Sequence, residues 1–380
     1  MAGPQRTLFI VAGEHSGDAY GARLARSLRR KEPGIRLYGL GGPRMAEAGV
    51  ELFQDLTAHA VMGVLGLAGN AAGLVGAYRK ITHRLSIDRP AGIVLIDFPE
   101  FNLAVAGHAH RVGVPVIDYV SPQVWAWRTG RVRKIAARVR KMLCLFEFEE
   151  EFYRRHGVPV AHVGHPLLDT MADKLAVTDR AAVRDDLGLP RSDTIIGLLP
   201  GSRRKEVQHI LPLLLRSAGI VRREHPAARF VLAAAEGLPP AIFDEIGGRF
   251  DVPFQTVTGR THDVMLASDL LLICSGTATL EAALLGTPMV VTYQANLLNY
   301  ILFGTLVRPG CYALPNIIAG KRIVPERYMI DARPNRIASA ALDLLDGRLD
   351  EVRRELGVVR ENLGRPGAGD RAADEILALT

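Results

Sequence analysis

Two apolar segments in the second half of the chain each run directly into a loop that could bind phosphate. They are LLPGSR at residues 198–203 and LLLICSGTATLE at residues 270–281. Small residues allow backbone N–H groups to approach an anion closely, and a following helix directs the positive end of its dipole at the same point. We therefore predict two anion-binding loops, the first formed by Gly201, Ser202 and Arg203 and the second by Ser275, Gly276, Thr277 and Thr279.

Two side chains near these loops suit the rest of a nucleotide. Arg203 carries a planar guanidinium that matches phosphate oxygens, and Glu281 could accept hydrogen bonds from the two vicinal hydroxyls of a ribose. Together they indicate a nucleoside diphosphate that carries a sugar. The alternative is a pair of ordinary strand-to-helix turns, since Gly, Ser and Thr are favoured at helix N-caps whether or not a ligand binds.

Neither a metal nor a cofactor is expected. The chain contains no Asp-x-Asp triplet, and its acidic residues do not cluster with histidines as metal ligands would. In a metal-independent reaction, protein charge must stabilise a departing diphosphate. Arg203 and the two helix N-termini could do so.

Carboxylates follow one strongly apolar segment of the first half, GIVLIDFPEFN. Asp97 or Glu100 could act as a general base toward an incoming hydroxyl, provided that the surroundings raise the pKa of one of them. His15, in the loop GEHSGD, is a rival base, although a lone loop histidine more often has a structural role. Ser16 and Asp18 of the same loop could simply cap the helix that follows.

Apolar segments alternate with helical segments in both halves, as in parallel doubly wound sheets. The length of 380 residues favours two domains, and strand signals lapse at residues 163–193. We therefore expect an α/β fold with two Rossmann-like domains, at residues 1–169 and 170–380, that face an interdomain cleft, and C-terminal packing helices after about residue 330. The expected strands are TLFIVAG, IRLYGLGG, GIVLID, VPVIDYV and MLCLF, then TIIGLLPGS, ARFVLAAAE, FQTVTG, LLLICSG and PMVVTYQ.

The net charge of +7 is concentrated in residues 128–141, which hold Lys and Arg but no acidic residue. A solvated helix face is the ordinary explanation of such a run. Because Trp125 and Trp127 directly precede it, a surface for anionic lipid headgroups or for a phosphorylated substrate carries comparable weight. Nucleic acid is not expected, since no RNA- or DNA-binding motif accompanies the charge.

Residues 60–78 carry no charge, which approaches the length of a membrane span. Glycines and Asn70 dilute their hydrophobicity, so we expect a flexible apolar loop leading into a helix. The loop could enter the bilayer interface or contact acyl chains; the alternative is a helix packed inside the first domain. Widely spaced cysteines and a start without a signal-peptide pattern predict buried thiols and a cytoplasmic location.

Several longer blocks are similar to those of one family, in the family's order. They are VAGEHSGD, GGPRM, AVMG, IDFPEFN, YVSPQVWAWR, FEFEEEFY, VGHPLLD, LLPGSR, SGTATLEAAL, PMVVTY and LPNIIAG. On these blocks the chain resembles the lipid-A-disaccharide synthases, glycosyltransferases of the two-domain GT-B type. YVSPQVWAWR and LPNIIAG are the most specific, whereas related nucleotide-sugar enzymes carry loops like PGSR and SGTATLE.

The resemblance implies an inverting transfer of a diacylglucosamine unit from UDP to the 6-hydroxyl of diacylglucosamine 1-phosphate. The products are UDP and the β-1,6-linked lipid A disaccharide. Both substrates are acylated. The resemblance therefore implies that the segments at residues 60–78 and 128–141 contact an anionic membrane surface, on the inner face of the inner membrane. A homo-oligomer is compatible with the sequence.

The resemblance also implies roles for individual residues. Asn316 would join the UDP site, and the acidic residue at position 100 would be the base. This chain has Glu100 where the family pattern has Asp, and His15 where other members have a different small residue, so Asp97 stays open as the alternative base. The first-domain residues expected to bind the acceptor are Gly13, Glu14, Ser16, Asp18, Asn102, Ser121, Trp127 and Arg128.

Two rival functions stay open. Another GT-B enzyme, such as the glycosyltransferase that makes lipid II or a UDP-sugar 2-epimerase, would share the nucleotide site, but the blocks DFPEFN and WAWR count against it. A non-catalytic membrane-surface protein that binds nucleotide sugars would show UDP affinity without releasing UDP from a supplied donor and acceptor.

Overall fold

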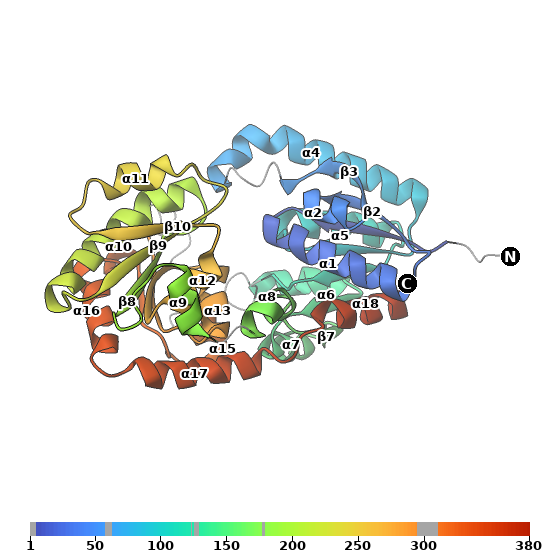
Figure 1. The fold of residues 1–380 in the computed structure, drawn as a ribbon. Coiled ribbons are helices and arrows are strands. Elements are labelled where there is room, and N and C mark those ends of the chain that lie inside the picture. The colour runs from blue at the N-terminus through green and yellow to red at the C-terminus, as the bar shows by residue number, and fades with distance from the viewer. Residues whose placement is uncertain (1–4, 58–62, 123, 125–128, 177–178, 295–310) are drawn as a thin grey trace. The chain divides into compact units, whose positions relative to one another are not determined.

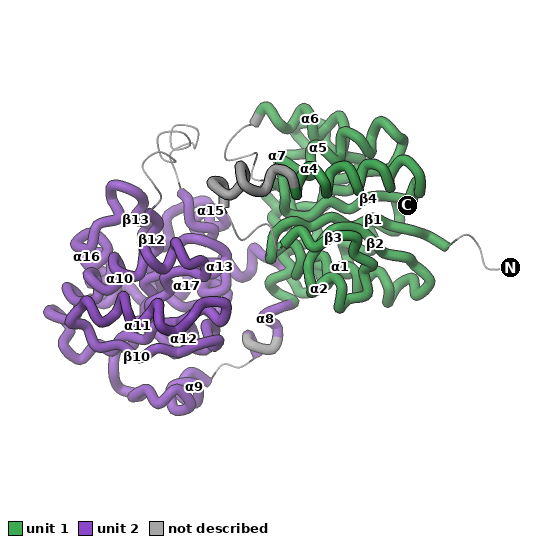
Figure 2. The backbone as a smooth tube through the Cα atoms, turned by 90° about the horizontal axis from the view of Figure 1, so that it is seen from above, with its two compact units in different colours: residues 1–169, 365–380 green, residues 170–364 purple. Residues whose placement is uncertain are grey.

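The computed structural model describes residues 5–57, 63–122, 124, 129–176, 179–294 and 311–380. The chain divides into two compact units, each with its own parallel sheet (Figure 2). Unit 1 comprises Met1–Asp169 and Arg365–Thr380, and unit 2 comprises Thr170–Gly364. The cleft expected between two domains stays a prediction.

The sheet of unit 1 has seven parallel strands in the order β3-β2-β1-β4-β5-β6-β7. Helices cover both of its faces (Figure 1). Its strands are β1 (Thr7–Ala12), β2 (Arg36–Gly41), β3 (Glu51–Asp55), β4 (Gly92–Ile96), β5 (Val116–Tyr119), β6 (Lys141–Cys144) and β7 (Val160–His162). Its helices are α1 (His15–Lys31), α2 (Pro43–Glu47), α4 (Gly63–Asp88), α5 (Pro99–Arg111), η1 (Thr129–Arg131), α6 (Val132–Arg138), α7 (Glu147–Arg155) and α18 (Ala368–Leu379).

Both faces of this sheet are apolar because helices bury both. Successive side chains of β1 point to opposite faces, so that Phe9 and Val11 join one hydrophobic cluster while Leu8 and Ile10 join the other. This two-sided burial explains why the strands appear in the sequence as continuous apolar runs.

The sheet of unit 2 has six parallel strands in the order β10-β9-β8-β11-β12-β13. Its strands are β8 (Ile195–Leu199), β9 (Arg229–Ala234), β10 (Phe254–Thr258), β11 (Leu270–Cys274), β12 (Met289–Tyr293) and β13 (Glu326–Tyr328). Its helices are α9 (Arg180–Asp186), α10 (Arg204–Glu224), α11 (Ala241–Gly247), α12 (Thr261–Ala267), α13 (Thr277–Leu284), α15 (Leu314–Ala319), η2 (Met329–Asp331), α16 (Pro334–Leu345) and α17 (Leu349–Asn362). Helix α8 (Leu167–Ala176) begins in unit 1 and ends in unit 2.

The expected domain range 170–380 needs one correction, because the last helix belongs to unit 1. Helix α18 packs on α1, as the red and blue helices of Figure 1 show. Its residues Ala372, Ala373 and Ile376 complete one of the two hydrophobic clusters of the first sheet. Arg371 adds a hydrogen bond from its Nε to the Val163 carbonyl at 2.8 Å. Apolar burial of this helix therefore returns the end of the chain to the first unit.

The expected loop within residues 60–78 is also corrected, since α4 begins at Gly63. Its later turns place Ala77, Ile81 and Leu85 in the core of unit 1. Burial of these side chains stabilises the helix against a cost of about 1 kcal/mol for each glycine. Among the described residues, no helix is long and apolar enough to cross a membrane.

The ten strands expected from apolar runs are all confirmed. Strands β3, β7 and β13 were missed. Each lies at the edge of its sheet, and each has mainly partly exposed side chains rather than an apolar run. The C-terminal helices α16, α17 and α18 are confirmed as well.

Candidate active site

The two predicted anion-binding loops lie side by side at the point where the strand order of unit 2 reverses. From β8 the chain proceeds to β9 and β10 on one side and then returns to β11 on the other. Such a switch point opens a crevice at the carboxyl ends of the two central strands, where α/β proteins bind ligands. Because Leu199 pairs with Ile273, the loops after β8 and β11 both start at this crevice.

The loop after β11 exposes backbone groups to a possible ligand. Gly276 has φ 155° and ψ −166°, a conformation that is essentially restricted to glycine. Apart from its two chain neighbours, no described residue has an atom within 4 Å of the place where its Cβ would be. Gly276 and Thr277 are exposed at the start of α13, where the first N–H groups of a helix have no intrahelical acceptor. The Ser275 hydroxyl accepts a hydrogen bond from Tyr328 at 2.9 Å and keeps its own O–H to donate.

Thr279 stabilises the conformation of this loop. Its side chain is fully buried, and its hydroxyl donates to the Gly276 carbonyl at 2.8 Å. The structure therefore gives Thr279 the role of holding the turn, where the sequence predicted a contact with the diphosphate.

The loop after β8 is already occupied by a carboxylate of its own helix. The backbone N–H groups of Ser202 and Arg203 each donate to Oε2 of Glu206 at 3.2 Å. Gly201 is in the left-handed region at φ 107°, and a Cβ there would lie 2.6 Å from the same oxygen. These backbone donors are thus satisfied within the protein.

Arg203 is the group of this loop that can still turn to a phosphate. Its side chain is 72% exposed, and its Nη1 lies 3.0 Å from Oε1 of Glu206. Burial raises the pKa of the Cys274 thiol to about 12, and the charges of Glu206 and Arg203 act on the same thiol in opposite directions. The charges of Glu206 and Arg203 at the start of α10 therefore act on the end of β11.

Glu206 could have been found from the sequence. Its signal is its position three residues after Arg203, as in a capping box.

Glu281 has a histidine partner that the sequence did not reveal. Nε2 of His262, in the first turn of α12, lies 3.1 Å from Oε2 of Glu281 on α13, and both side chains are partly buried. The only sequence signal for His262 is its position shortly after the apolar run of β10.

Asn316, which was predicted to join the UDP site, forms its hydrogen bonds within unit 2. It is fully buried. Its Oδ1 accepts from the backbone of Ile323 at 2.8 Å and Val324 at 2.9 Å. Its Nδ2 donates to the Val324 carbonyl at 2.9 Å and to Glu326 at 2.7 Å. All four hydrogen-bonding positions of the amide are filled, so Asn316 fixes the segment around β13.

Unit 1 has a switch point of its own, between β1 and β4. Ala12 pairs with Ile96, so the loops after these two strands lie next to each other. They are joined by a hydrogen bond of 2.7 Å from the Ser16 hydroxyl to Oδ2 of Asp97. Gly13 completes the junction, because a Cβ there would lie 2.4 Å from the ring of Phe98.

Asp97 is held in a strained and partly buried position. Its φ is 42°, which is unusual for a residue with a side chain. Asn102, on the helix α5 that follows, is buried. Its amide oxygen can accept hydrogen bonds from the backbone N–H groups of Phe98 at 3.2 Å and Ile96 at 3.3 Å. Burial raises the pKa of Asp97 from 3.8 to about 6, with the Ser16 hydrogen bond lowering it and the charge of Glu14 raising it.

Glu100, the base that the resemblance favoured, lies in different surroundings. Its side chain is 70% exposed and forms an ion pair with Arg131. Of the two carboxylates of the sequence hypothesis, Asp97 is the one that is shielded from solvent, and its raised pKa suits a general base near neutral pH.

A third carboxylate, Asp118 on β5, was missed. It is 5% exposed. Burial, with a further contribution from the charge of Asp97, raises its pKa from 3.8 to about 8. The available signal was an acidic residue inside the apolar strand VPVIDYV.

The structure gives structural contacts to two further residues that were expected to bind the acceptor. Asp18 is buried and accepts from the backbone N–H groups of Gly42 at 2.9 Å, Met45 at 3.0 Å and Arg44 at 3.1 Å, so it caps α2 rather than its own helix. The buried Ser121 hydroxyl lies 3.0 Å from the Tyr153 hydroxyl.

Of the other residues expected to bind the acceptor, Glu14 is partly exposed. His15, the rival base, is exposed at the start of α1. Trp127 and Arg128 lie outside the described residues. Within the described ranges, no group of three or more His, Cys, Asp and Glu side chains could hold a metal ion; metal independence stays a prediction.

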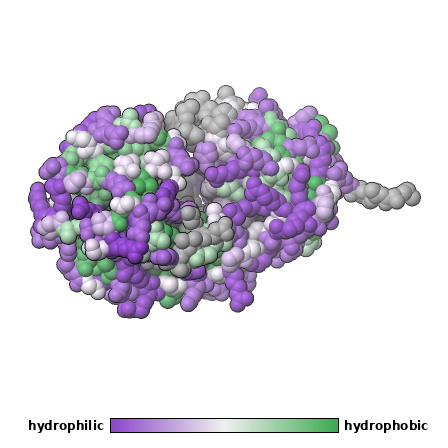
Figure 3. Space-filling view, in the orientation of Figure 1, coloured by the Kyte–Doolittle hydropathy of each residue, from purple (hydrophilic) through white to green (hydrophobic). Residues whose placement is uncertain are grey.

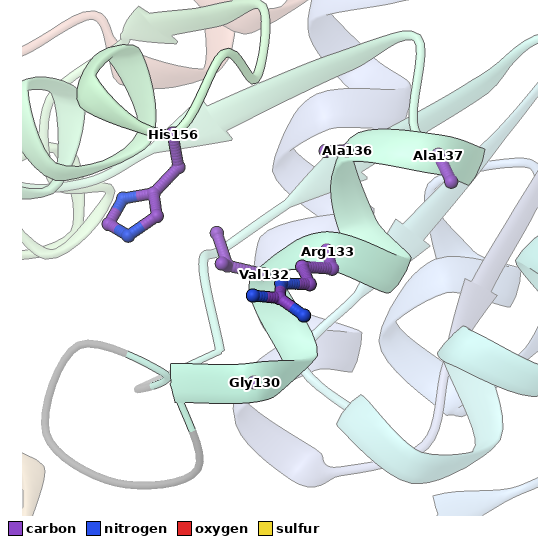
Figure 4. A pocket seen from close by; sticks show the side chains of 6 residues that line it. All are labelled: Gly130, Val132, Arg133, Ala136, Ala137 and His156. Atoms are coloured by element: carbon purple, nitrogen blue, oxygen red, sulfur yellow. The ribbon is translucent and has the colours of Figure 1, made fainter.

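An open hollow of about 730 Å³ lies elsewhere on unit 1. Figure 4 shows its lining along η1 and α6, with one histidine from the end of α7. None of the residues that follow β1 or β4 lines it, and we do not assign the chemistry to it. The lining residues are Gly130, Val132, Arg133, Ala136, Ala137 and His156.

Solved structures share this fold at low sequence identity. UDP-GlcNAc 2-epimerase from Neisseria meningitidis is 13% identical with a TM-score of 0.60, covering 98% of this chain and 100% of its own. MurG from Acinetobacter baumannii is 12% identical with a TM-score of 0.59, covering 99% of this chain and 100% of its own. These similarities establish the two-domain GT-B architecture.

Sequence comparison identifies the family. The family model described as lipid-A-disaccharide synthetase matches residues 8–363. The lipid-A-disaccharide synthase of Syntrophus aciditrophicus is 40% identical over 378 residues, which are 99% of this chain and 97% of that protein. The enzyme of the same name from Geobacter metallireducens is 38% identical over 378 residues, with 99% and 98% coverage. The chain therefore belongs to the lipid-A-disaccharide synthase family of glycosyltransferases.

Proposed function

We propose that this protein condenses UDP-2,3-diacylglucosamine with 2,3-diacylglucosamine 1-phosphate to the β-1,6-linked lipid A disaccharide 1-phosphate and UDP. Family membership supports the reaction. The observation that carries the chemistry is that each unit has a distinct group at its own switch point. Unit 2 has a glycine-containing loop after β11 whose residues Gly276 and Thr277 are exposed, and unit 1 has a carboxylate with a raised pKa after β4.

In the proposed reaction, the oxygen of the acceptor 6-hydroxyl attacks C1 of the donor sugar, and Asp97 accepts the proton that this hydroxyl loses. The bond between C1 and the diphosphate oxygen breaks, and UDP leaves with the electron pair. A single displacement of this kind inverts the configuration at C1. The proton on Asp97 returns to solvent after the products leave.

We assign the base to Asp97 rather than to Glu100 because of their surroundings. A base must be unprotonated at the working pH yet able to hold a proton in the transition state, and a pKa of about 6 meets both conditions. The Ser16 hydroxyl and the Asn102 amide hold the loop so that the Asp97 carboxylate has a fixed position. Glu100 is exposed and neutralised by Arg131.

In unit 2 the departing diphosphate would be bound by the loop after β11. Its backbone N–H groups at Gly276 and Thr277 and the hydroxyl of Ser275 are the donors, and the exposed guanidinium of Arg203 supplies positive charge. Glu281 would accept from the ribose hydroxyls. Gly201, Ser202, Thr279 and Asn316 support this site through the contacts described above.

We further propose that the protein acts at the cytoplasmic face of the inner membrane, bound peripherally to anionic lipid through the segments at residues 60–78 and 128–141. In the first segment, Val75 is a large apolar side chain exposed on α4, and in the second, Arg133 and Lys134 are exposed on α6. Hydrophilic side chains predominate on the face shown in Figure 3. Nucleic acid is not proposed as a partner; a homo-oligomer is compatible with this account.

The test is to incubate the purified protein with both lipid substrates in the presence of EDTA and to measure disaccharide and UDP by mass spectrometry. We expect one UDP for each disaccharide. UDP binding without either product would leave the nucleotide site in place but would contradict the lipid A reaction. Monosaccharide release without an acceptor would indicate an epimerase- or hydrolase-like activity instead.

A further inference from the structure

The pair formed by His262 and Glu281 lies at the site proposed for the nucleotide. Nε2 of His262 and Oε2 of Glu281 are 3.1 Å apart. An ionised carboxylate can only accept hydrogen bonds, so Nε2 must carry a hydrogen and donate it. The two residues come from helices α12 and α13, which contact each other.

The position of Glu281 in its helix directs it toward the anion-binding loop. It lies four residues after Thr277, the first residue of α13, and residues with this spacing are neighbours on one helix face. Side chains of a helix also lean toward its N-terminus. The spacing and the lean together place Glu281 on the same helix face as Thr277 and direct it toward the loop at residues 275–277.

Among the residues that the structure describes, the carboxylate of Glu281 has no hydrogen-bond partner besides His262. Its three side-chain torsions would leave the carboxylate free to turn, whereas the bond from His262 fixes Oε2 and leaves Oε1 available. Two vicinal hydroxyls need a carboxylate in one definite orientation to make two hydrogen bonds at once. Fixing that orientation before binding reduces the ordering cost when the ligand arrives.

We propose that His262 is a positioning residue that holds Glu281 for a ribose diol and so gives the site its preference for ribonucleotides over 2′-deoxyribonucleotides. The proposal rests on the proposed function in its assignment of Glu281 to the ribose. The competing explanation is that the pair only joins α12 to α13. In that case its loss would change stability but not the preference between the two sugars.

The experiment is isothermal titration of the full-length protein with UDP and with 2′-deoxyuridine 5′-diphosphate. We expect the protein to prefer UDP, and His262→Ala to weaken UDP binding by about 3- to 10-fold with little change for the deoxy ligand. His262→Gln, which keeps an N–H donor, should restore most of the preference. In a Glu281→Ala background, His262→Ala should have no further effect on it.

The outcomes separate the two claims. If the unaltered protein does not bind UDP, the proposed nucleotide site itself is wrong. If it binds UDP but His262→Ala weakens both ligands equally, or weakens neither, His262 has no role in ribose selection while the nucleotide site stands. Thermal unfolding of each variant shows whether a uniform loss comes from reduced folding.

Discussion

The Ser16 hydroxyl donates a hydrogen bond of 2.7 Å to Oδ2 of Asp97, although 81 residues separate them in the chain. The bond joins the loops after β1 and β4, which the parallel pairing of these strands brings together. It also stabilises the ionised form of a carboxylate that burial disfavours. The balance of these two effects sets the pH at which Asp97 can accept a proton.

The first prediction concerns this balance. A base with a pKa of about 6 is protonated and inactive at lower pH, so kcat/KM should rise with pH, reach half of its maximum near pH 6 and level off about one pH unit higher. Ser16→Ala removes an interaction that lowers the Asp97 pKa, and it should move the midpoint of this profile to higher pH. Ser16→Thr keeps a hydroxyl and serves as the control. An unmoved or lowered midpoint in Ser16→Ala would show that the profile does not report Asp97.

The second prediction concerns Asp118 and stability. Its pKa is about 8 in the folded protein against 3.8 as the ordinary value, so its protonated form favours folding. This contribution is fully present below about pH 4 and is lost as the pH rises to about 8. Asp118→Asn cannot ionise, and its stability relative to the unaltered protein should increase by roughly 1.4 kcal/mol for each pH unit in that window.

Thermal unfolding between pH 5 and pH 9 measures this effect as a difference in Tm that grows with pH and then levels off. A difference that is the same at every pH would mean that Asp118 is already ionised below pH 5 in the folded protein, which would contradict a raised pKa.

The third prediction concerns the loop after β11. Gly276→Ala forces a side chain into a conformation that costs about 1–3 kcal/mol, so the loop should shift and UDP affinity should fall by about 5- to 100-fold. Gly286→Ala is the matched control, because Gly286 also has a positive φ, of 70°, and free space around it, but lies beyond the other end of α13. Equal UDP affinity in the two variants, measured by calorimetry, would remove Gly276 from the diphosphate site.

Much of the fold could be predicted from sequence because its central strands are buried on both faces. Continuous apolar runs such as LLLIC and GIVLI leave few alternatives. The edge strand β3, ELFQD, lacks that signal because its side chains are partly exposed. Glycine content suggested a loop where α4 forms, since composition does not show that Ile81 and Leu85 are buried against the sheet. Likewise, the helical spacing of α18 does not show which unit it joins.

The candidate site could be located from sequence but not resolved into roles. Asp97 and Glu100 are three residues apart, and their spacing cannot show that one is covered and the other faces solvent beside Arg131. Asp18 and Asn316 were expected to bind ligands from their positions in motifs, and motifs do not show that backbone N–H groups of later residues occupy their side-chain oxygens. His262 was missed for the same reason. Glu206 and Asp118 did have sequence signals, in a helix-cap spacing and in an acid within an apolar strand.

The most direct test compares Asp97→Asn with Glu100→Gln in single-turnover reactions with both lipid substrates. Each substitution removes a carboxylate with little change in shape. We expect Asp97→Asn to slow disaccharide formation by roughly 10²- to 10⁴-fold with unchanged UDP affinity, while Glu100→Gln retains most of the rate. A fast Asp97→Asn variant beside a slow Glu100→Gln variant would contradict the assignment of Asp97 as the base.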